Sequence, residues 1–154
     1  MLLDKLLEYA HQKDVTVQYI DMPITMSGLY GDGLIWLNKG LPTRAATACA
    51  LGEELGHHNK TVGDILDQTR IENRKQERRA REWGHDYLLP LSRLVDAYHA
   101  RIEGRFELSE YLGVTEDFLQ EAIDRLKDRH GIAVYYNDYL IIFDPLQVYE
   151  PYSI

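Results

Sequence analysis

Two adjacent glutamates and two adjacent histidines lie within the segment EELGHH, residues 53–58. On a helix, residues i and i+4 point the same way one turn apart, so Glu53 and His57 could bind one metal ion. Position i+1 is rotated by about 100°, which directs Glu54 toward a water at the metal. The spacing matches the geometry of H-E-x-x-H, a zinc motif whose glutamate is a general base, with glutamate as the first ligand.

A second register in this segment pairs Glu54 with His58, again at i and i+4. It would bind a metal without a general base, because Leu55 takes the place of the base. We therefore predict Glu53 and His57 as metal ligands, Glu54 as the catalytic base, and His58 as an accessory residue that forms a nearby hydrogen bond or contacts substrate. A solvated helix turn could also contain these residues, so the prediction requires a third ligand.

Glu77 is the best candidate for this third ligand, because hydrolytic zinc sites usually take three protein ligands. On a helix, Ala80 and Gly84 continue the face of Glu77 and are small enough for another helix to approach closely. His85 lies about 12 Å further along such a helix, too far to share an ion with Glu77. We expect three other polar residues of this region on the surface: Glu72, Glu82 and His85.

The pattern of the N-terminal half predicts the elements that would position these residues. Apolar residues at helical spacing predict a helix over 2–13. VTVQYI (15–20) and LIWLN (34–38) are typical of strands, and the glycines of GLYGDG (28–33) between them favour turns, which predicts a small antiparallel sheet. EELGHH belongs to a helix expected over 44–58, with Thr43 as its N-cap.

The C-terminal half is expected to be helical and then β. Helices are predicted over 68–89, stopped by Pro90, over 91–102, and twice within 106–130, where a junction at 112–114 precedes Thr115 as an N-cap. IAVYY and YLIIF flank Asn137-Asp138, which predicts a hairpin. The fold class is therefore α+β and mainly helical. We expect a core over 1–104 and a helical pair with a hairpin over 105–154, packed together as one compact unit.

Composition narrows the class of function. A net charge of −8 opposes general binding to nucleic acid or anionic membranes. No apolar run reaches the 18 or so residues of a membrane span, and the first residues lack the pattern of a signal peptide, so we expect a cytoplasmic protein.

Cys49 cannot form an internal disulfide and is expected to be a buried thiol. The basic stretch 70–82 is either a solvated helix face or a docking surface for an acidic partner.

These segments together resemble the ImmA/IrrE family of zincin-like metallopeptidases, which are frequent in phages and mobile elements. The resemblance rests on LIWLN (34–38), CALGEELGHH (49–58) and RKQERRAREWGHDYLLP (74–90). It implies that Glu53, His57 and Glu77 hold the metal and that Glu54 is the base. The family has histidine where this chain has Glu53. The extra negative charge should weaken the metal's pull on a bound water and could favour Mn²⁺ over Zn²⁺.

The resemblance also implies a function: cleavage of a helix-turn-helix repressor of the same mobile element, which would derepress its genes. The strand at 34–38 could hold an extended substrate by edge pairing. One alternative, suggested by Glu53, is an inactive family member that binds the repressor without cutting it.

The other alternative is a DNA-binding regulator, because residues 106–123 have a helix, glycine turn and helix layout. Residues 107–124 carry six acids and no lysine or arginine, so phosphates would repel this segment and direct contact with nucleic acid is not expected. The sequence indicates no particular oligomeric state.

Overall fold

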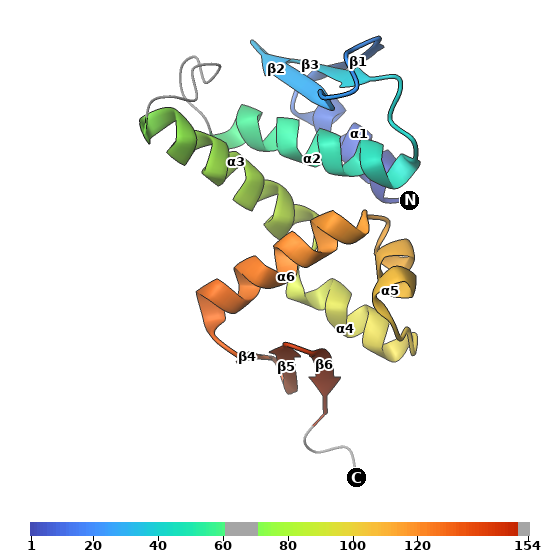
Figure 1. The fold of residues 1–154 in the computed structure, drawn as a ribbon, viewed down its shortest axis with the longest axis vertical. Coiled ribbons are helices and arrows are strands. Elements are labelled where there is room, and N and C mark those ends of the chain that lie inside the picture. The colour runs from blue at the N-terminus through green and yellow to red at the C-terminus, as the bar shows by residue number, and fades with distance from the viewer. Residues whose placement is uncertain (61–70, 151–154) are drawn as a thin grey trace. The chain divides into compact units, whose positions relative to one another are not determined.

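The computed structural model describes residues 1–60 and 71–150, with side chains described from residue 74 onward after the gap. Its helices and strands form two compact units, Met1–Leu88 and Leu89–Ile154 (Figure 1). The boundary expected from the sequence was at residue 104. Helices and sheets occupy separate stretches of each unit, so the predicted α+β class is confirmed. No helix among the described residues is long and apolar enough to cross a membrane.

The first unit contains a three-stranded sheet in the order β1-β3-β2, formed by β1 (Thr16–Ile20), β2 (Gly28–Gly31) and β3 (Leu34–Asn38). β1 and β3 correspond to the two predicted strands, but they pair in parallel. The expected antiparallel pairing of these two strands is wrong. The segment predicted as a turn contains a further strand, β2, and it is β2 that pairs with β3 in antiparallel fashion. The actual turn needs only Asp32 and Gly33, both with positive φ.

Helix α2 (Arg44–Lys60) is packed against this sheet and against α1 (Leu2–Gln12). Thr43 caps α2 as predicted, since its Oγ1 accepts a hydrogen bond from the Ala46 amide at 3.0 Å. The core of this packing consists of fully buried side chains, each stabilising the fold by roughly 1.5–3 kcal/mol. They are Leu6, Ile35, Leu37, Leu51 and Leu55.

Helix α3 (Ile71–Leu88) crosses α2 at very short range. A Cβ atom added to Gly56 would lie 2.1 Å from the backbone oxygen of Ala80. One added to Gly84 would lie 3.3 Å from the backbone of Gly52. The close helix approach predicted at Ala80 and Gly84 is therefore confirmed, and small residues on both helices permit it.

The second unit contains α4 (Leu91–His99), α5 (Arg105–Leu112), α6 (Glu116–His130) and an antiparallel sheet β4-β5-β6. The predicted helix pair is confirmed: Gly113 ends α5 with a positive φ, and the Thr115 Oγ1 accepts a hydrogen bond from the Phe118 amide. β4 (Ala133–Tyr136) and β5 (Tyr139–Phe143) form the predicted hairpin. A third strand, β6 (Leu146–Tyr149), was not predicted.

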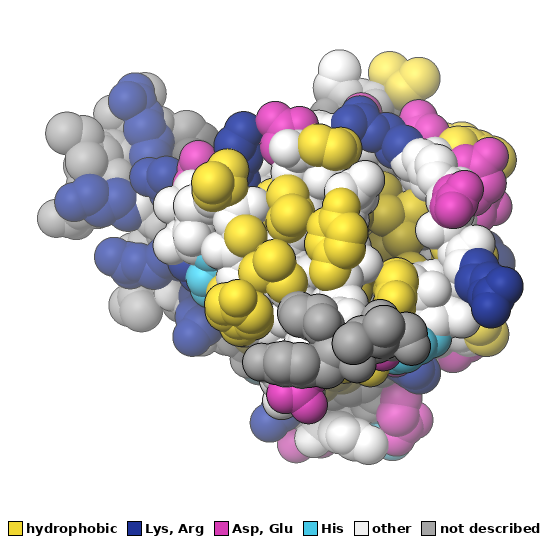
Figure 2. Space-filling view, turned by 90° about the horizontal axis from the view of Figure 1, so that it is seen from below, with side chains coloured by type: hydrophobic (Ala, Val, Ile, Leu, Met, Phe, Trp, Pro, Cys, Tyr) yellow, Lys and Arg dark blue, Asp and Glu magenta, His cyan; other side chains and the backbone are white. Residues whose placement is uncertain are grey.

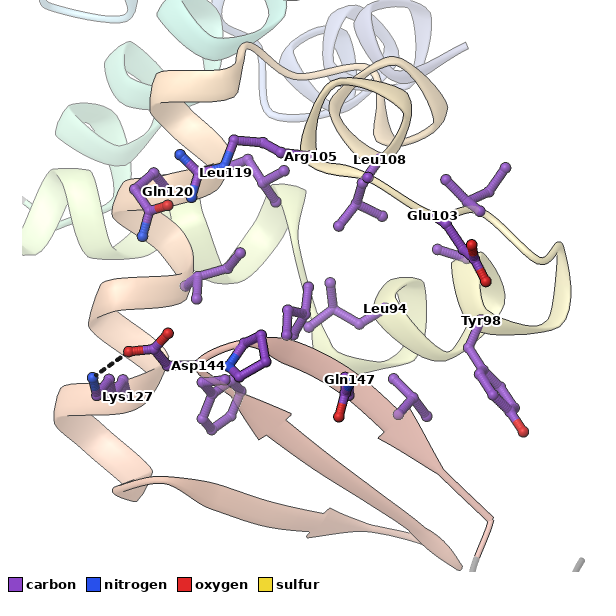
Figure 3. Close-up of a pocket in the computed structure, with 18 of the residues that line it drawn as sticks. Leu94, Tyr98, Glu103, Arg105, Leu108, Leu119, Gln120, Lys127, Asp144 and Gln147 are labelled. Carbon is purple, nitrogen blue, oxygen red and sulfur yellow. Dashed lines mark hydrogen bonds and ion pairs between the residues drawn. The ribbon is translucent and has the colours of Figure 1, made fainter.

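A hollow of about 810 Å³ lies within the second unit, lined by residues of α4, α5, α6 and β6 and by the loops between them (Figure 3). Lys127 and Asp144 form an ion pair of 3.1 Å at its edge (Figure 3). Several large apolar side chains of this unit are exposed, and Figure 2 shows hydrophobic side chains gathered on the face seen from below. The exposed large apolar side chains of this unit include Tyr98, Phe106, Tyr111, Ile132, Tyr135 and Tyr149.

Candidate metal centre

Helix α2 carries four of the five predicted site residues, Glu53, Glu54, His57 and His58. Leu51 and Leu55 are fully buried, and Glu54 and His57 in the same part of α2 are buried as well, with exposed fractions of 7% and 4%. Glu53 is half-buried. Glu77 is contributed by α3 and is also half-buried. Because α3 crosses α2 so closely at Gly56, Glu77 is held beside the buried histidine.

The structure brings the three predicted ligands together. One potential ligand atom each of Glu53, His57 and Glu77 lies within 4.8 Å of the other two. The Nε2 atom of His57 and the Oε1 atom of Glu77 are 3.1 Å apart. Zinc binds such nitrogen and oxygen atoms at about 2.0–2.2 Å, so small side-chain rotations would bring all three onto one cation. An imidazole and two carboxylates form a donor set that fits a divalent metal ion.

The pKa values of Glu54 and His57 are both raised above the ordinary values of these residue types. Burial raises the pKa of Glu54 to about 7, against an opposing effect of His57, and the charges of Glu53 and Glu77 add to the increase. Burial lowers the pKa of His57, but the hydrogen bond with Glu77 and the nearby carboxylates outweigh it, so this pKa is raised overall. Glu54 can therefore hold or release a proton near neutral pH.

Strand β2 lies directly over the predicted base. A Cβ atom added to Gly28 would lie 3.1 Å from the Cγ atom of Glu54, so a larger residue there would press on the Glu54 side chain. β2 is an edge of the sheet formed by the described residues, whereas β3 has a strand on each side. The expectation that the strand at 34–38 offers a free edge is therefore wrong, and β2 has that edge.

His58 faces β2 and lies outside the group of three ligands. Its Nδ1 atom is 2.8 Å from the hydroxyl of Tyr30, which also accepts a hydrogen bond from the Gly33 amide at 3.2 Å. The sequence predicts a nearby hydrogen bond for His58 but does not identify Tyr30 as its partner, because the pattern of GLYGDG favours a turn. The alternation of Gly28, Tyr30 and their neighbours across a strand is the signal that could have identified it.

Residues of α3 around Glu77 depart from expectation in two ways. His85 was predicted on the surface and is only 3% exposed. That prediction followed from the distance between His85 and Glu77 along the helix, which excludes a shared ion but does not determine burial. His85 directly follows Gly84, where α3 approaches α2. Arg81 was not predicted as a site residue, yet its Nε atom lies 4.0 Å from the Oε1 atom of Glu53.

Two further polar residues were expected on the surface, and a thiol in the interior. Glu82 is half-exposed and pairs with Arg78 at 3.7 Å. The side chain of Glu72 lies outside the described residues. Cys49 was expected to be buried but is half-buried. Its neighbours Ala48 and Ala50 occupy the buried positions of this turn instead.

The hollow of the second unit is separate from the metal ligands, because none of the residues that line it belongs to the first unit. Its lining includes apolar side chains together with Glu103, Asp124 and Asp144. Among the described residues, only Glu53, His57 and Glu77 form a group able to hold a metal ion. We therefore place the candidate site at the crossing of α2 and α3.

Comparison with known proteins gives one positive result. The family model described as the IrrE N-terminal-like domain matches residues 10–124. The matched range covers α2 and α3 with all of the predicted site residues and extends into α6. No curated protein and no solved structure gives a significant match.

Proposed function

Because the chain belongs to the peptidase family described as the IrrE N-terminal-like domain, we propose that it is a metal-dependent peptidase. Glu53, His57 and Glu77 hold the metal, and Glu54 is the general base. The observation that supports this most strongly is the meeting of the three ligand atoms within 4.8 Å, next to a buried carboxyl group with a pKa of about 7. General bases work best when their pKa is close to the working pH.

Each residue has a distinct task in this proposal. The bound cation would polarise the scissile carbonyl and acidify a water molecule. Glu54 accepts the proton of the attacking water and later donates it to the leaving amine. Its burial suits both steps, since neither the charged nor the neutral carboxyl group is strongly favoured near pH 7. His57 and Glu77 face each other from two helices and so make the site depend on the helix crossing.

The metal proposed is Zn²⁺, with Mn²⁺ as the alternative. Three protein ligands and an open position are typical of hydrolytic zinc sites. Two carboxylates and one imidazole form a donor set richer in oxygen than two imidazoles and one carboxylate, and hard oxygen ligands suit Mn²⁺. Titration with both ions separates these alternatives.

The substrate proposed is a helix-turn-helix repressor encoded by the same mobile element, as the family resemblance implies. An extended segment of it would pair with the free edge of β2, which lies over Glu54. Tyr30 and His58 would hold that strand in place through their hydrogen bond. Pairing along the backbone of β2 would present a peptide bond near the base.

The test is incubation of the purified protein with the neighbouring repressor, with and without a chelator. We expect cleavage that the chelator stops and that added Zn²⁺ or Mn²⁺ restores. Glu54→Gln should abolish cleavage while metal and repressor binding persist. Metal content near zero after purification without chelators, with no gain on adding either ion, would contradict the proposal.

A second candidate function is binding of the repressor without cleavage. The observation that favours it is Glu53, whose extra negative charge weakens the acidifying effect of a metal on water. In that case the repressor remains intact under all metal conditions, and Glu54→Gln does not change repressor binding.

A further inference from the structure

Arg81 stands next to the ligand that distinguishes this metal centre. Its Nε atom lies 4.0 Å from the Oε1 atom of Glu53. Arg81 is one helical turn after Glu77 on α3, so the two side chains lie on the same face of that helix. The helix that supplies one proposed ligand therefore also places a cation beside another.

The charges explain why a cation is useful at this position. Glu53 and Glu77 place carboxylate oxygens within 4.8 Å of each other, and two like charges at this distance repel one another. Arginine remains protonated at every working pH, so its compensation of a carboxylate does not switch off as the pH changes. Arg81 can thus offset the negative charge that Glu53 adds to the ligand set.

The geometry also limits how strongly Arg81 holds Glu53. A separation of 4.0 Å is the long end of an ion pair, and the two side chains are 49% and 34% exposed. Such a pair is weak and screened by salt. Glu53 can therefore leave Arg81 for a metal ion at little cost, while the guanidinium stays close enough to affect that ion.

We propose that Arg81 is a positioning and charge-compensating residue of the metal centre, which holds the Glu53 carboxylate and lowers the affinity of the site for divalent cations. This role rests on the proposed function, because it assumes that Glu53, His57 and Glu77 bind a metal. Arg81 competes with the ion for Glu53 and repels the ion directly. The positive charge of Arg81 cancels the negative charge of Glu53, so the two side chains together act on the ion much as one neutral ligand would.

The chain contains a matched control. Arg78 and Glu82 form an ion pair on the same helix at 3.7 Å, and both are at least as exposed as the Arg81 pair. Glu82 is not among the residues that could hold the metal. Loss of Arg78 therefore removes the same charge from the same helix without releasing a proposed ligand.

The experiment measures the dissociation constants of the full chain for Zn²⁺ and Mn²⁺ by competition with a chromophoric chelator. Arg81→Gln should bind both ions roughly two- to fivefold more tightly, the range expected of an exposed ion pair. This gain should shrink at high salt. Arg81→Lys, which keeps the charge, should remain near the wild type, and Arg78→Gln should not change. In a Glu53→His background, where Arg81 no longer pairs with a carboxylate at position 53, the gain from Arg81→Gln should be smaller.

Three results would overturn the role of Arg81. They are equal affinity in the wild type and Arg81→Gln, weaker binding in Arg81→Gln, and a gain of the same size in Arg78→Gln. Metal binding by all variants without dependence on Arg81 would leave the proposed peptidase function intact. Absence of metal binding by the wild type would overturn both proposals together.

Discussion

The Nε2 atom of His57 lies 3.1 Å from the Oε1 atom of Glu77, although the two residues are 20 positions apart in the sequence. This contact joins α2 to α3 beside the tight crossing at Gly56 and Ala80. Through this contact, Glu77 of α3 joins Glu53 and His57 of α2 in the proposed three-ligand metal centre. The folding of the first unit and the binding of a metal should therefore depend on each other.

Glu77→Gln tests the third ligand. The amide is a poorer metal ligand than the carboxylate and lacks its charge, so we expect affinity for Zn²⁺ to fall tenfold or more, the scale seen when metal sites lose supporting groups. Titration against a competing chelator measures this. Glu82→Gln, on the same helix but outside the ligand group, is the control. Equal Zn²⁺ affinities for the two variants would remove Glu77 from the site.

The metal-free protein should lose stability as the pH rises from about 4.5 to 7. Glu54 has a pKa of about 7 when folded and an ordinary value of 4.5, so the folded state binds more protons in this window. The cost of ionising Glu54 is on the order of 3 kcal/mol. The raised pKa of His57 acts in the same direction above its ordinary value of 6.5, because stability from its protonated form is lost as the pH rises.

Glu54→Gln should flatten this pH dependence and make the metal-free protein more stable at pH 8. Chemical denaturation in the presence of a chelator at several pH values gives the free energies of unfolding. Glu82→Gln should retain the slope of the wild type. A slope unchanged in Glu54→Gln would show that Glu54 ionises at its ordinary pKa in the folded protein.

Gly56→Ala should separate α2 from α3. The new Cβ atom would meet the backbone oxygen of Ala80 at 2.1 Å, and neither helix backbone can yield locally. We expect a loss of at least about 1–3 kcal/mol in the free energy of unfolding, with weaker metal binding because Glu77 moves away from His57. Gly31→Ala is the control, since its Cβ would have no atom within 4 Å. Thermal and chemical denaturation of both variants measure the free energies of unfolding. Equal values for Gly56→Ala and Gly31→Ala would mean that α2 and α3 leave room for a Cβ atom at position 56.

Tyr30→Phe removes the hydroxyl group that joins β2 to His58. The hydroxyl also accepts a hydrogen bond from the Gly33 amide. Each lost hydrogen bond costs about 0.5–1.5 kcal/mol, so kcat/KM for a peptide substrate should fall roughly five- to hundredfold, mainly through KM. Zn²⁺ affinity should not change, because neither residue belongs to the ligand group. Tyr19→Phe, on the opposite edge strand, is the control. Weaker Zn²⁺ binding in Tyr30→Phe would assign the pair to the metal instead of the strand.

The sequence by itself determined the features that depend on neighbouring residues. The cap at Thr43, the glycine junction before Thr115 and the hairpin turn at Asn137 all follow from local backbone chemistry, and each was predicted. The i, i+4 spacing placed Glu53 and His57 on one helix face for the same reason. Small residues at Ala80 and Gly84 further indicated which side of α3 would meet another helix.

Only the tertiary structure decided which distant segments become neighbours. It placed β2 instead of β1 in the antiparallel position beside β3, buried His85, and brought Tyr30 to His58 and Arg81 to Glu53. Each of these outcomes depends on competition among contacts far apart in the chain, such as the helix spacing that one glycine permits. Residue types and local periodicity do not predict which of these long-range contacts form, because that depends on how the whole first unit fills its core.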